Sequence, residues 1–159
     1  SQVQLDVNND GLADTVSWPT KGNAVLFADW NKSGILDSRS EFMFGLFSTN
    51  KNASDLEGLQ LFDYDEDGDM DVEDRIYPSL FLWEDRNSDG ICTTDEVASL
   101  AERNLVLNFA ASRPSGQTMQ GNVLQYKFSY RMQYRTADGT ERLVSAGQAY
   151  SVLVQAKLQ

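Results

Sequence analysis

The clearest hydrophobic pattern in the chain is a strict alternation near its C-terminus. From 124 to 134 every second residue is apolar or aromatic: Leu124, Tyr126, Phe128, Tyr130, Met132 and Tyr134. A period of two over this length predicts a half-buried β-strand. Residues 137–140 (Ala-Asp-Gly-Thr) predict a hairpin turn, after which 141–156 are expected to return as a second strand. The aromatic side chains are interpreted as core packing, with a ligand-binding platform as the alternative.

Shorter patterns precede this region. Segments 25–30 and 80–83 are apolar and are expected to be extended, while short helices are expected at 40–47, 54–62 and 94–102. Thr94 fits the N-cap of the last of these helices, because two acids follow it in the first turn. The polar segment 113–121 contains Pro and Gly and predicts a loop.

One polar segment has a spacing that coordination chemistry requires. Residues 85–96 match the EF-hand calcium loop D-x-[DN]-x-[DN]-G-x5-E at every specified position. Calcium takes roughly six to eight oxygen ligands, and a glycine at loop position 6 allows the sharp turn between them. The expected ligands are Asp85, Asn87, Asp89, the carbonyl of Ile91, Thr93 (directly or through water) and Glu96.

The same register occurs three more times. We number the segments in chain order: loop 1 (6–14), loop 2 (29–41), loop 3 (63–74) and loop 4 (85–96). Loop 3 offers Asp63, Asp65, Asp67, the carbonyl of Asp69, Asp71 and Asp74. Loop 2 offers Asp29, Asn31, Ser33, the carbonyl of Ile35, Asp37 and, one residue late, Glu41. Loop 1 offers Asp6, Asn8, Asp10, the carbonyl of Leu12 and Asp14, but has Ser17 at position 12.

Acidic turns with a glycine can also exist simply because they are well solvated. Against that alternative, position 8 of each loop holds a small or apolar residue, where paired EF-type loops touch: Ala13, Leu36, Met70 and Cys92. Solvated turns have no need of such a residue. We therefore expect the chain to bind about two to four Ca²⁺ ions through these loops.

Charge is distributed unevenly and supports this expectation. Residues 1–102 carry 22 acids and 6 bases, whereas 103–159 carry 2 acids and 7 bases. Repulsion among the acids should destabilise the metal-free fold, so metal binding and folding are expected to be coupled. A nucleic-acid partner is not expected from so acidic a chain. The C-terminal bases are interpreted as the solvated face of a sheet rather than a polyanion site.

The remaining composition narrows the function classes. The chain has one cysteine and no histidine, so an internal disulfide is excluded, and Cys92 is interpreted as a packing residue. No segment approaches the length needed for a membrane-spanning helix, so membrane insertion is not expected. No signal peptide is recognised, and the chain looks like a piece of a longer protein. An enzyme is not expected, because the carboxylates are accounted for by the loops.

Three segments together resemble a known module. The runs 29–45 (Asp-x-Asn-x-x-Gly…Glu-Phe-x-Phe-Gly), 59–71 and 80–97 (Leu-Phe-Leu-Trp-Glu-Asp…) are similar to the EF-hand-like calcium-binding module of secreted bacterial RTX (repeats-in-toxin) exoproteins and surface proteins. The opening run 3–11 resembles the family's "LDLDGDG". The resemblance covers about residues 3–105 and implies a secreted or cell-surface location.

Some members of that family cleave themselves, in a calcium-dependent reaction, at an Asp-Pro bond before the opening motif. Here the prolines follow Trp18, Tyr77 and Arg113, so the chain contains no Asp-Pro bond. Its first residue is also not the Pro that such a cut would leave, and we therefore expect a member that does not cleave itself.

The expected fold class is α+β: tandem EF-hand-like calcium loops with short helices over 1–104, then an antiparallel β part over 105–159 packed on them as one structural domain. The expected function is an extracellular structural module that calcium folds or rigidifies. The alternatives are a calcium-dependent interaction or adhesion module, with a protein partner on the C-terminal sheet, and a self-processing module.

Overall fold

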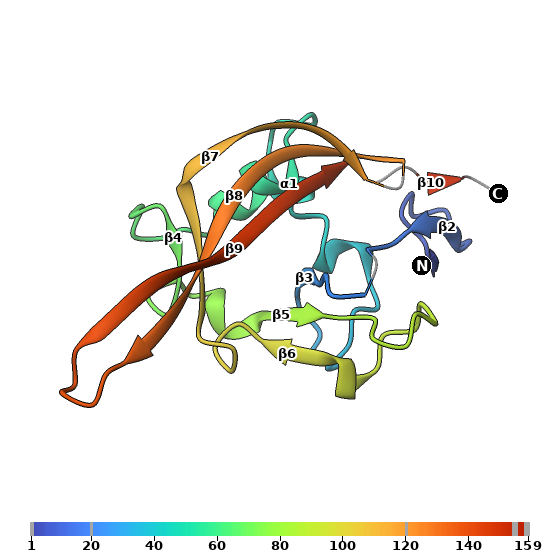
Figure 1. The fold of residues 1–159 in the computed structure, drawn as a ribbon. Helices are drawn as coiled ribbons and strands as arrows, with labels where there is room; N and C mark the ends of the chain where they lie inside the picture. Colours follow the sequence, from blue (N-terminus) through green and yellow to red (C-terminus); the bar gives the residue numbers. More distant parts are fainter. Residues whose placement is uncertain (1, 20, 120, 154–155, 158–159) are drawn as a thin grey trace.

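The computed structural model describes residues 2–19, 21–119, 121–153 and 156–157. Strands dominate these residues and form three antiparallel sheets (Figure 1). The largest sheet has the order β4-β7-β8-β9, with bounds Asp69–Met70, Leu105–Met119, Asn122–Arg135 and Glu141–Leu153. A second sheet has the order β1-β2-β10, with bounds Gln2–Leu5, Asp14–Ser17 and Ala156–Lys157. The third has the order β3-β5-β6, with bounds Val25–Ala28, Leu80–Trp83 and Val97–Ser99.

Strands β7, β8 and β9 form a long, strongly curved sheet that arches over the rest of the molecule (Figure 1). The register between β7 and β8 shifts between Asn108 and Arg113 and again between Pro114 and Gln117. Such irregularities bend a strand and increase its twist. Pro114 is tolerated because proline is confined to edge strands and bulges, and the described pairing of β4 with β7 reaches only Leu107 and Asn108.

Helical structure is limited to one short α-helix, α1 (Asp55–Gln60), and four 3₁₀ turns among the described residues. The turns are η1 (Arg39–Glu41), η2 (Phe44–Phe47), η3 (Tyr77–Ser79) and η4 (Thr94–Glu96). Ser54 and Glu57 form a capping box at the start of α1, in which each side chain accepts the other residue's backbone N–H. The helix lies so close to η2 that a Cβ on Gly58 would be 1.9 Å from the Phe44 carbonyl oxygen.

The α+β prediction with tandem EF-hand helices is wrong, because the described chain is mainly β. Segment 40–47 forms two 3₁₀ turns, and of segment 94–102 only Thr94–Glu96 is helical. Val97–Ser99 instead pairs with β5, so sheet formation overrides the local helix signal. The loop expected at 113–121 was also misjudged, since strand β7 extends to Met119.

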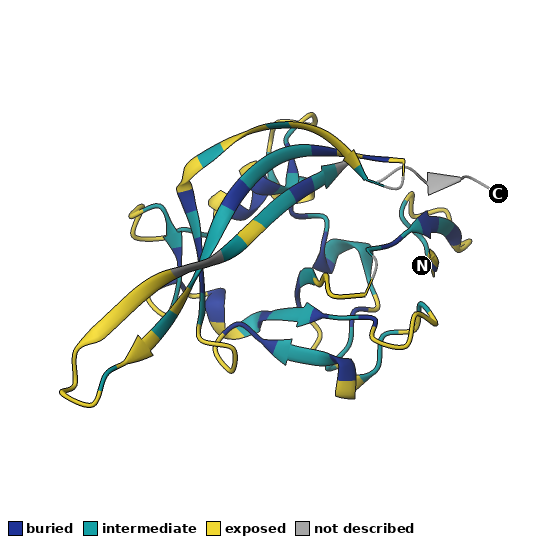
Figure 2. Ribbon diagram, in the orientation of Figure 1, coloured by how far each residue is buried: buried dark blue, intermediate teal, exposed yellow. Residues whose placement is uncertain are grey.

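Two hydrophobic clusters lie on either side of sheet β3-β5-β6. The larger contains residues from both halves of the chain: Ala28, Phe44, Leu56, Leu59, Met70, Ile76, Tyr77, Leu80, Leu100, Leu107, Phe109 and Phe128. The smaller surrounds Trp83: Val3, Val16, Trp18, Phe27, Leu36 and Phe42. Buried residues lie near the start of β7 and in the first half of β8, whereas the far end of the β8–β9 hairpin is mostly exposed (Figure 2). The larger cluster therefore joins the curved sheet to loop 3 through Met70, whereas Leu36 of loop 2 belongs to the smaller cluster.

Candidate metal centres in four acidic loops

The four acidic loops have the same backbone turn. Loop position 4 has a positive φ of 58° to 64° in Asn9, Lys32, Glu66 and Ser88. Position 6 has a positive φ of 73° to 87° in Gly11, Gly34, Gly68 and Gly90. A positive φ is uncommon outside glycine, so its recurrence at a fixed position shows that the loops share one local structure.

The first carboxylate of each loop turns back over its own segment. It accepts a hydrogen bond from the N–H of the position-6 glycine, at 2.9 Å for Asp6, 3.0 Å for Asp29 and Asp63, and 3.2 Å for Asp85. The side chains at positions 3 and 5 likewise accept from the N–H groups two residues further on. In loop 3 the carboxylate oxygens of Asp63, Asp65 and Asp67 lie within 4.8 Å of one another. The turn of loop 3 thus gathers three carboxylate oxygens close together.

A buried acid closes each loop. The closing acids are Asp14, Glu41, Asp74 and Glu96, with exposed fractions between 1% and 7%. Three of them accept the N–H of the residue after the first loop acid: Asp14 from Val7 at 3.3 Å, Asp74 from Tyr64 at 2.7 Å and Glu96 from Arg86 at 2.9 Å. Loop 1 therefore uses its position-9 acid for the role that position 12 has in loops 3 and 4.

Glu41 closes loop 2 in a different way. Its Oε2 accepts the N–H groups of Asp37 and Ser38, at 3.0 and 3.2 Å. Its other oxygen, Oε1, is buried and has no hydrogen-bond partner among the described residues. Burial and the nearby carboxylates of Asp37 and Asp29 raise the pKa of Glu41.

Two buried carboxylate oxygens without hydrogen-bond partners in the part of the chain that the structure describes, one in loop 2 and one in loop 3, bear on whether a cation fits these loops. Oδ1 of Asp63 is buried without a partner in the described chain, like Oε1 of Glu41, and burial together with nearby acids raises the pKa of Asp63. The described ion pairs, Arg131–Asp69 and Arg135–Glu141, involve none of the closing acids. A buried carboxylate oxygen is costly unless it is paired or bound to a metal. The donor set is all oxygen, which suits a hard cation such as Ca²⁺.

Position 7 was expected to contribute only a backbone carbonyl. The side chains of Leu12 and Ile91 are each 62% exposed and lie away from their loops, while the carbonyl of Ile35 accepts the Ser33 hydroxyl. Asp69 is different, because its carboxylate accepts from Asn108 and forms an ion pair with Arg131 on the curved sheet. Its side chain therefore connects loop 3 to β7 and β8.

The remaining ligands expected at positions 3 and 9 have mixed placements. Asp37 accepts the Asn31 amide at 2.9 Å across loop 2, and Asp71 accepts the N–H of Glu73. Thr93 hydrogen-bonds the side chain of Asp95, and this bond lowers the pKa of that exposed carboxyl. The position-9 acids of loops 2 and 3 thus hydrogen-bond within their own loops. Thr93, at position 9 of loop 4, instead contacts Asp95, which is not an expected ligand.

Position 8 was expected to be where paired loops touch, and two position-8 residues do meet. The N–H of Leu36 in loop 2 donates to Sγ of Cys92 in loop 4 at 3.2 Å, so two position-8 residues from distant segments meet. Burial, and to a smaller extent the nearby carboxylates of Glu96, Glu41 and Asp37, raise the pKa of Cys92 to about 11, which keeps the thiol protonated. Arg39 of loop 2 donates to the Val7 carbonyl of loop 1 at 2.8 Å. Loops 1, 2 and 4 therefore cluster, while loop 3 pairs with the curved sheet through Met70 and Leu107.

Together, the turns and the curved sheet define a mainly β protein with four acidic loops that share one backbone turn. The model of the SPM domain family matches residues 1–146, and the chain belongs to that family. It is also similar to the iron-regulated protein FrpA of Neisseria meningitidis serogroup C, with 28% identity over 134 residues. The match covers 79% of this chain and 12% of FrpA. Within the described residues, no helix is long and apolar enough to cross a membrane.

Proposed function

We propose that this chain is a calcium-binding structural module of a larger secreted or surface protein, and that Ca²⁺ folds or rigidifies it. The observation that carries the proposal is the buried closing acid of each loop, set against a repeated turn of oxygen ligands. Four buried carboxylates close to further acids are unfavourable in the absence of a cation.

The residues that would hold the ions are those of the four loops. A bound Ca²⁺ supplies positive charge, and the chain supplies oxygen atoms at fixed positions. The closing acid joins the two ends of its loop, as when Glu96 accepts the N–H groups of Arg86 and Asn87 and the Trp83 indole N–H. Filling loop 4 would therefore stabilise the packing of Trp83 in the smaller core.

The test is a calcium titration by isothermal calorimetry of the parent chain and two variants. Glu96→Gln removes one oxygen ligand and one charge, so it should bind one ion fewer than the parent. Glu66→Gln is the matched control, because Glu66 lies at loop position 4 and is exposed. Equal stoichiometry in Glu96→Gln and the parent would overturn the assignment of loop 4, and no calcium binding by the parent would overturn the function.

A second candidate is calcium-dependent self-processing, because the sequence resembles modules of which some members cut themselves. The chain contains no Asp-Pro bond, so a scissile bond of that type would have to lie in another part of the parent protein. Mass spectrometry of the full-length parent, before and after calcium addition, distinguishes the two. A calcium-dependent fragment with a defined new terminus favours self-processing, and an intact parent favours the structural module.

A further inference from the structure

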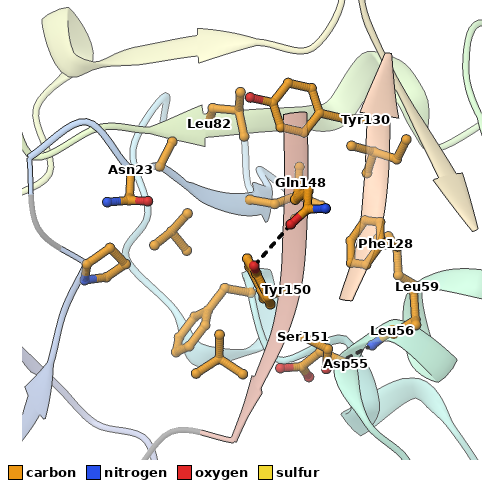
Figure 3. Close-up of a pocket in the computed structure, with 18 of the residues that line it drawn as sticks. Asn23, Asp55, Leu56, Leu59, Leu82, Phe128, Tyr130, Gln148, Tyr150 and Ser151 are labelled. Atoms are coloured by element: carbon orange, nitrogen blue, oxygen red, sulfur yellow. Dashed lines mark hydrogen bonds between the residues drawn. The ribbon is translucent and has the colours of Figure 1, made fainter. Parts of the chain in front are cut away.

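A pocket of about 410 Å³ lies between the inner face of the curved sheet and α1, away from the acidic loops (Figure 3). Its walls are mainly apolar or aromatic: Leu56, Leu59, Leu82, Phe128, Tyr130 and Tyr150. The volume falls within the range of about 300–1,000 Å³ that is common for small-molecule sites. Its exposed lining residues include Gly22, Asn23, Ala24 and Gln148, and these mark its mouth.

Polar groups gather on one side of this pocket. Figure 3 shows Asp55 beside Ser151, with Tyr150 between Asp55 and Gln148. The Tyr150 hydroxyl donates to Oε1 of Gln148 at 3.3 Å, which leaves the phenol oxygen able to accept a hydrogen bond. Oδ1 of Asp55 accepts the N–H of Gly45 at 2.9 Å. These polar groups present acceptor oxygens beside an apolar wall.

The charge of the pocket has one sign. Asp55 and Glu84 are among its lining residues, and the described lining contains no Lys or Arg. Burial raises the pKa of Asp55 to about 6, so its carboxyl is mostly ionised at neutral pH without a basic partner in the pocket. An ionised carboxylate in apolar surroundings is unfavourable unless a cation approaches it.

We propose that this pocket binds an organic monocation with an apolar tail, specifically a primary alkylamine in its ammonium form. The ammonium group would donate to the Asp55 carboxylate, and the alkyl tail would lie against Leu59, Leu82 and Phe128. A calcium ion fits this pocket poorly, because two carboxylates among mainly apolar walls supply fewer oxygen ligands than the roughly six to eight that calcium takes. An organic anion is disfavoured by both carboxylates.

The test uses the full chain in saturating calcium at pH 7.5, with n-hexylamine as the probe and binding followed by chemical shifts of the pocket residues. Hexanol and hexanoate have the same tail and differ in charge. Hexylammonium should bind at least tenfold more tightly than hexanol, and hexanoate should bind more weakly than either. Equal affinity for hexylammonium and hexanol, or no binding of hexylammonium, overturns the proposal, and this comparison needs no variant.

Variants then locate the charge. Asp55→Asn should reduce hexylammonium affinity at least tenfold and leave hexanol affinity unchanged. Glu57→Gln is the matched control, because Glu57 is an exposed acid on the same helix and does not line the pocket. Unchanged hexylammonium affinity in Asp55→Asn would overturn the role of Asp55. Calcium stoichiometry should be the same in both variants, so failure here leaves the calcium proposal standing.

Discussion

Asp55 should make the folded chain less stable as the pH rises, and the Asp55→Asn variant should remove that effect. The side chain is partly buried at the start of α1, and burial raises its pKa from 3.8 to about 6. A group whose pKa is higher in the folded than in the unfolded state contributes its full stabilisation at pH values below its unfolded-state pKa. This stabilisation is lost as the pH rises through the folded-state pKa. The asparagine side chain of the variant has nearly the shape of the protonated acid and does not titrate.

The magnitude follows from the shift. A rise of roughly two pKa units corresponds to about 3 kcal/mol between the protonated and ionised forms, which we take as an upper limit because Asp55 is not fully buried. An acid in the first turn of a helix also gains about 0.3–1 kcal/mol, which the variant loses. We therefore expect Asp55→Asn to be more stable than the parent by about 2 kcal/mol at pH 7.5 and nearly equal to it at pH 4.

The assay is urea unfolding at constant saturating calcium, from pH 4 to pH 8. Other carboxylates titrate in both proteins, so the difference in unfolding free energy isolates Asp55. Glu57→Gln is an informative control, since hydrogen bonds from Ser54 lower the pKa of Glu57. Its stability relative to the parent should fall as the pH rises, which is the opposite sign. A difference between Asp55→Asn and the parent that is constant across this range would refute the reasoning.

Three further predictions concern the loops and the sheet. Gly90→Ala should cost more than about 2 kcal/mol, because φ is +73° and a Cβ would lie 2.4 Å from a backbone oxygen of β1. Gly139→Ala, with φ +85° and nothing within 4 Å, should cost only about 1–2 kcal/mol in the same denaturation assay. Arg131→Gln breaks a partly buried ion pair with loop 3 and should cost about 1.5–3 kcal/mol. Arg135→Gln, at an exposed pair, should cost less than about 1 kcal/mol. Removing calcium with EDTA should lower the melting temperature, since each site filled at 100 times its Kd contributes about 2.7 kcal/mol; identical melting in EDTA and calcium would rule out the coupling.

Local features of this chain were readable from its sequence because their causes are local. The loop turns depend on an acid and a glycine five residues apart, and that glycine N–H bonds that acid in each loop. The extended segment 80–83 forms β5, and the alternating run 124–134 lies within β8. The short helix expected at 54–62 forms as α1, and the capping box that starts it joins partners only three residues apart.

Features that depend on distant partners were not readable. The contact between Leu36 and Cys92 joins residues 56 positions apart, so the sequence predicted that loops meet at position 8 but not that loop 2 meets loop 4. Segment 94–102 carries genuine helix-start signals, yet β5 pairs with Val97–Ser99 and prevents a long helix. The pocket beside Asp55 was missed for the same reason, since α1, β5, β8 and β9 each contribute lining residues.

Loop 3 differs from the other loops in what a bound ion would stabilise. Its Met70 pairs with Leu107 of β7, and the Asp69 carboxylate pairs with Arg131 of β8, so the loop is attached to the curved sheet at two points. Leu107 lies both in the larger core and in the lining of the Asp55 pocket. Under the proposed function, an ion in loop 3 would favour one position of the sheet over α1 and hence one shape of the pocket. Ions in loops 1, 2 and 4 would act mainly on the smaller core around Trp83, because those loops contact one another. Any coupling between metal binding and the shape of the pocket should therefore depend on loop 3. Arg131 of β8 is joined there to the side chain of Asp69, which is not an expected metal ligand, so a bound ion would not compete with this ion pair.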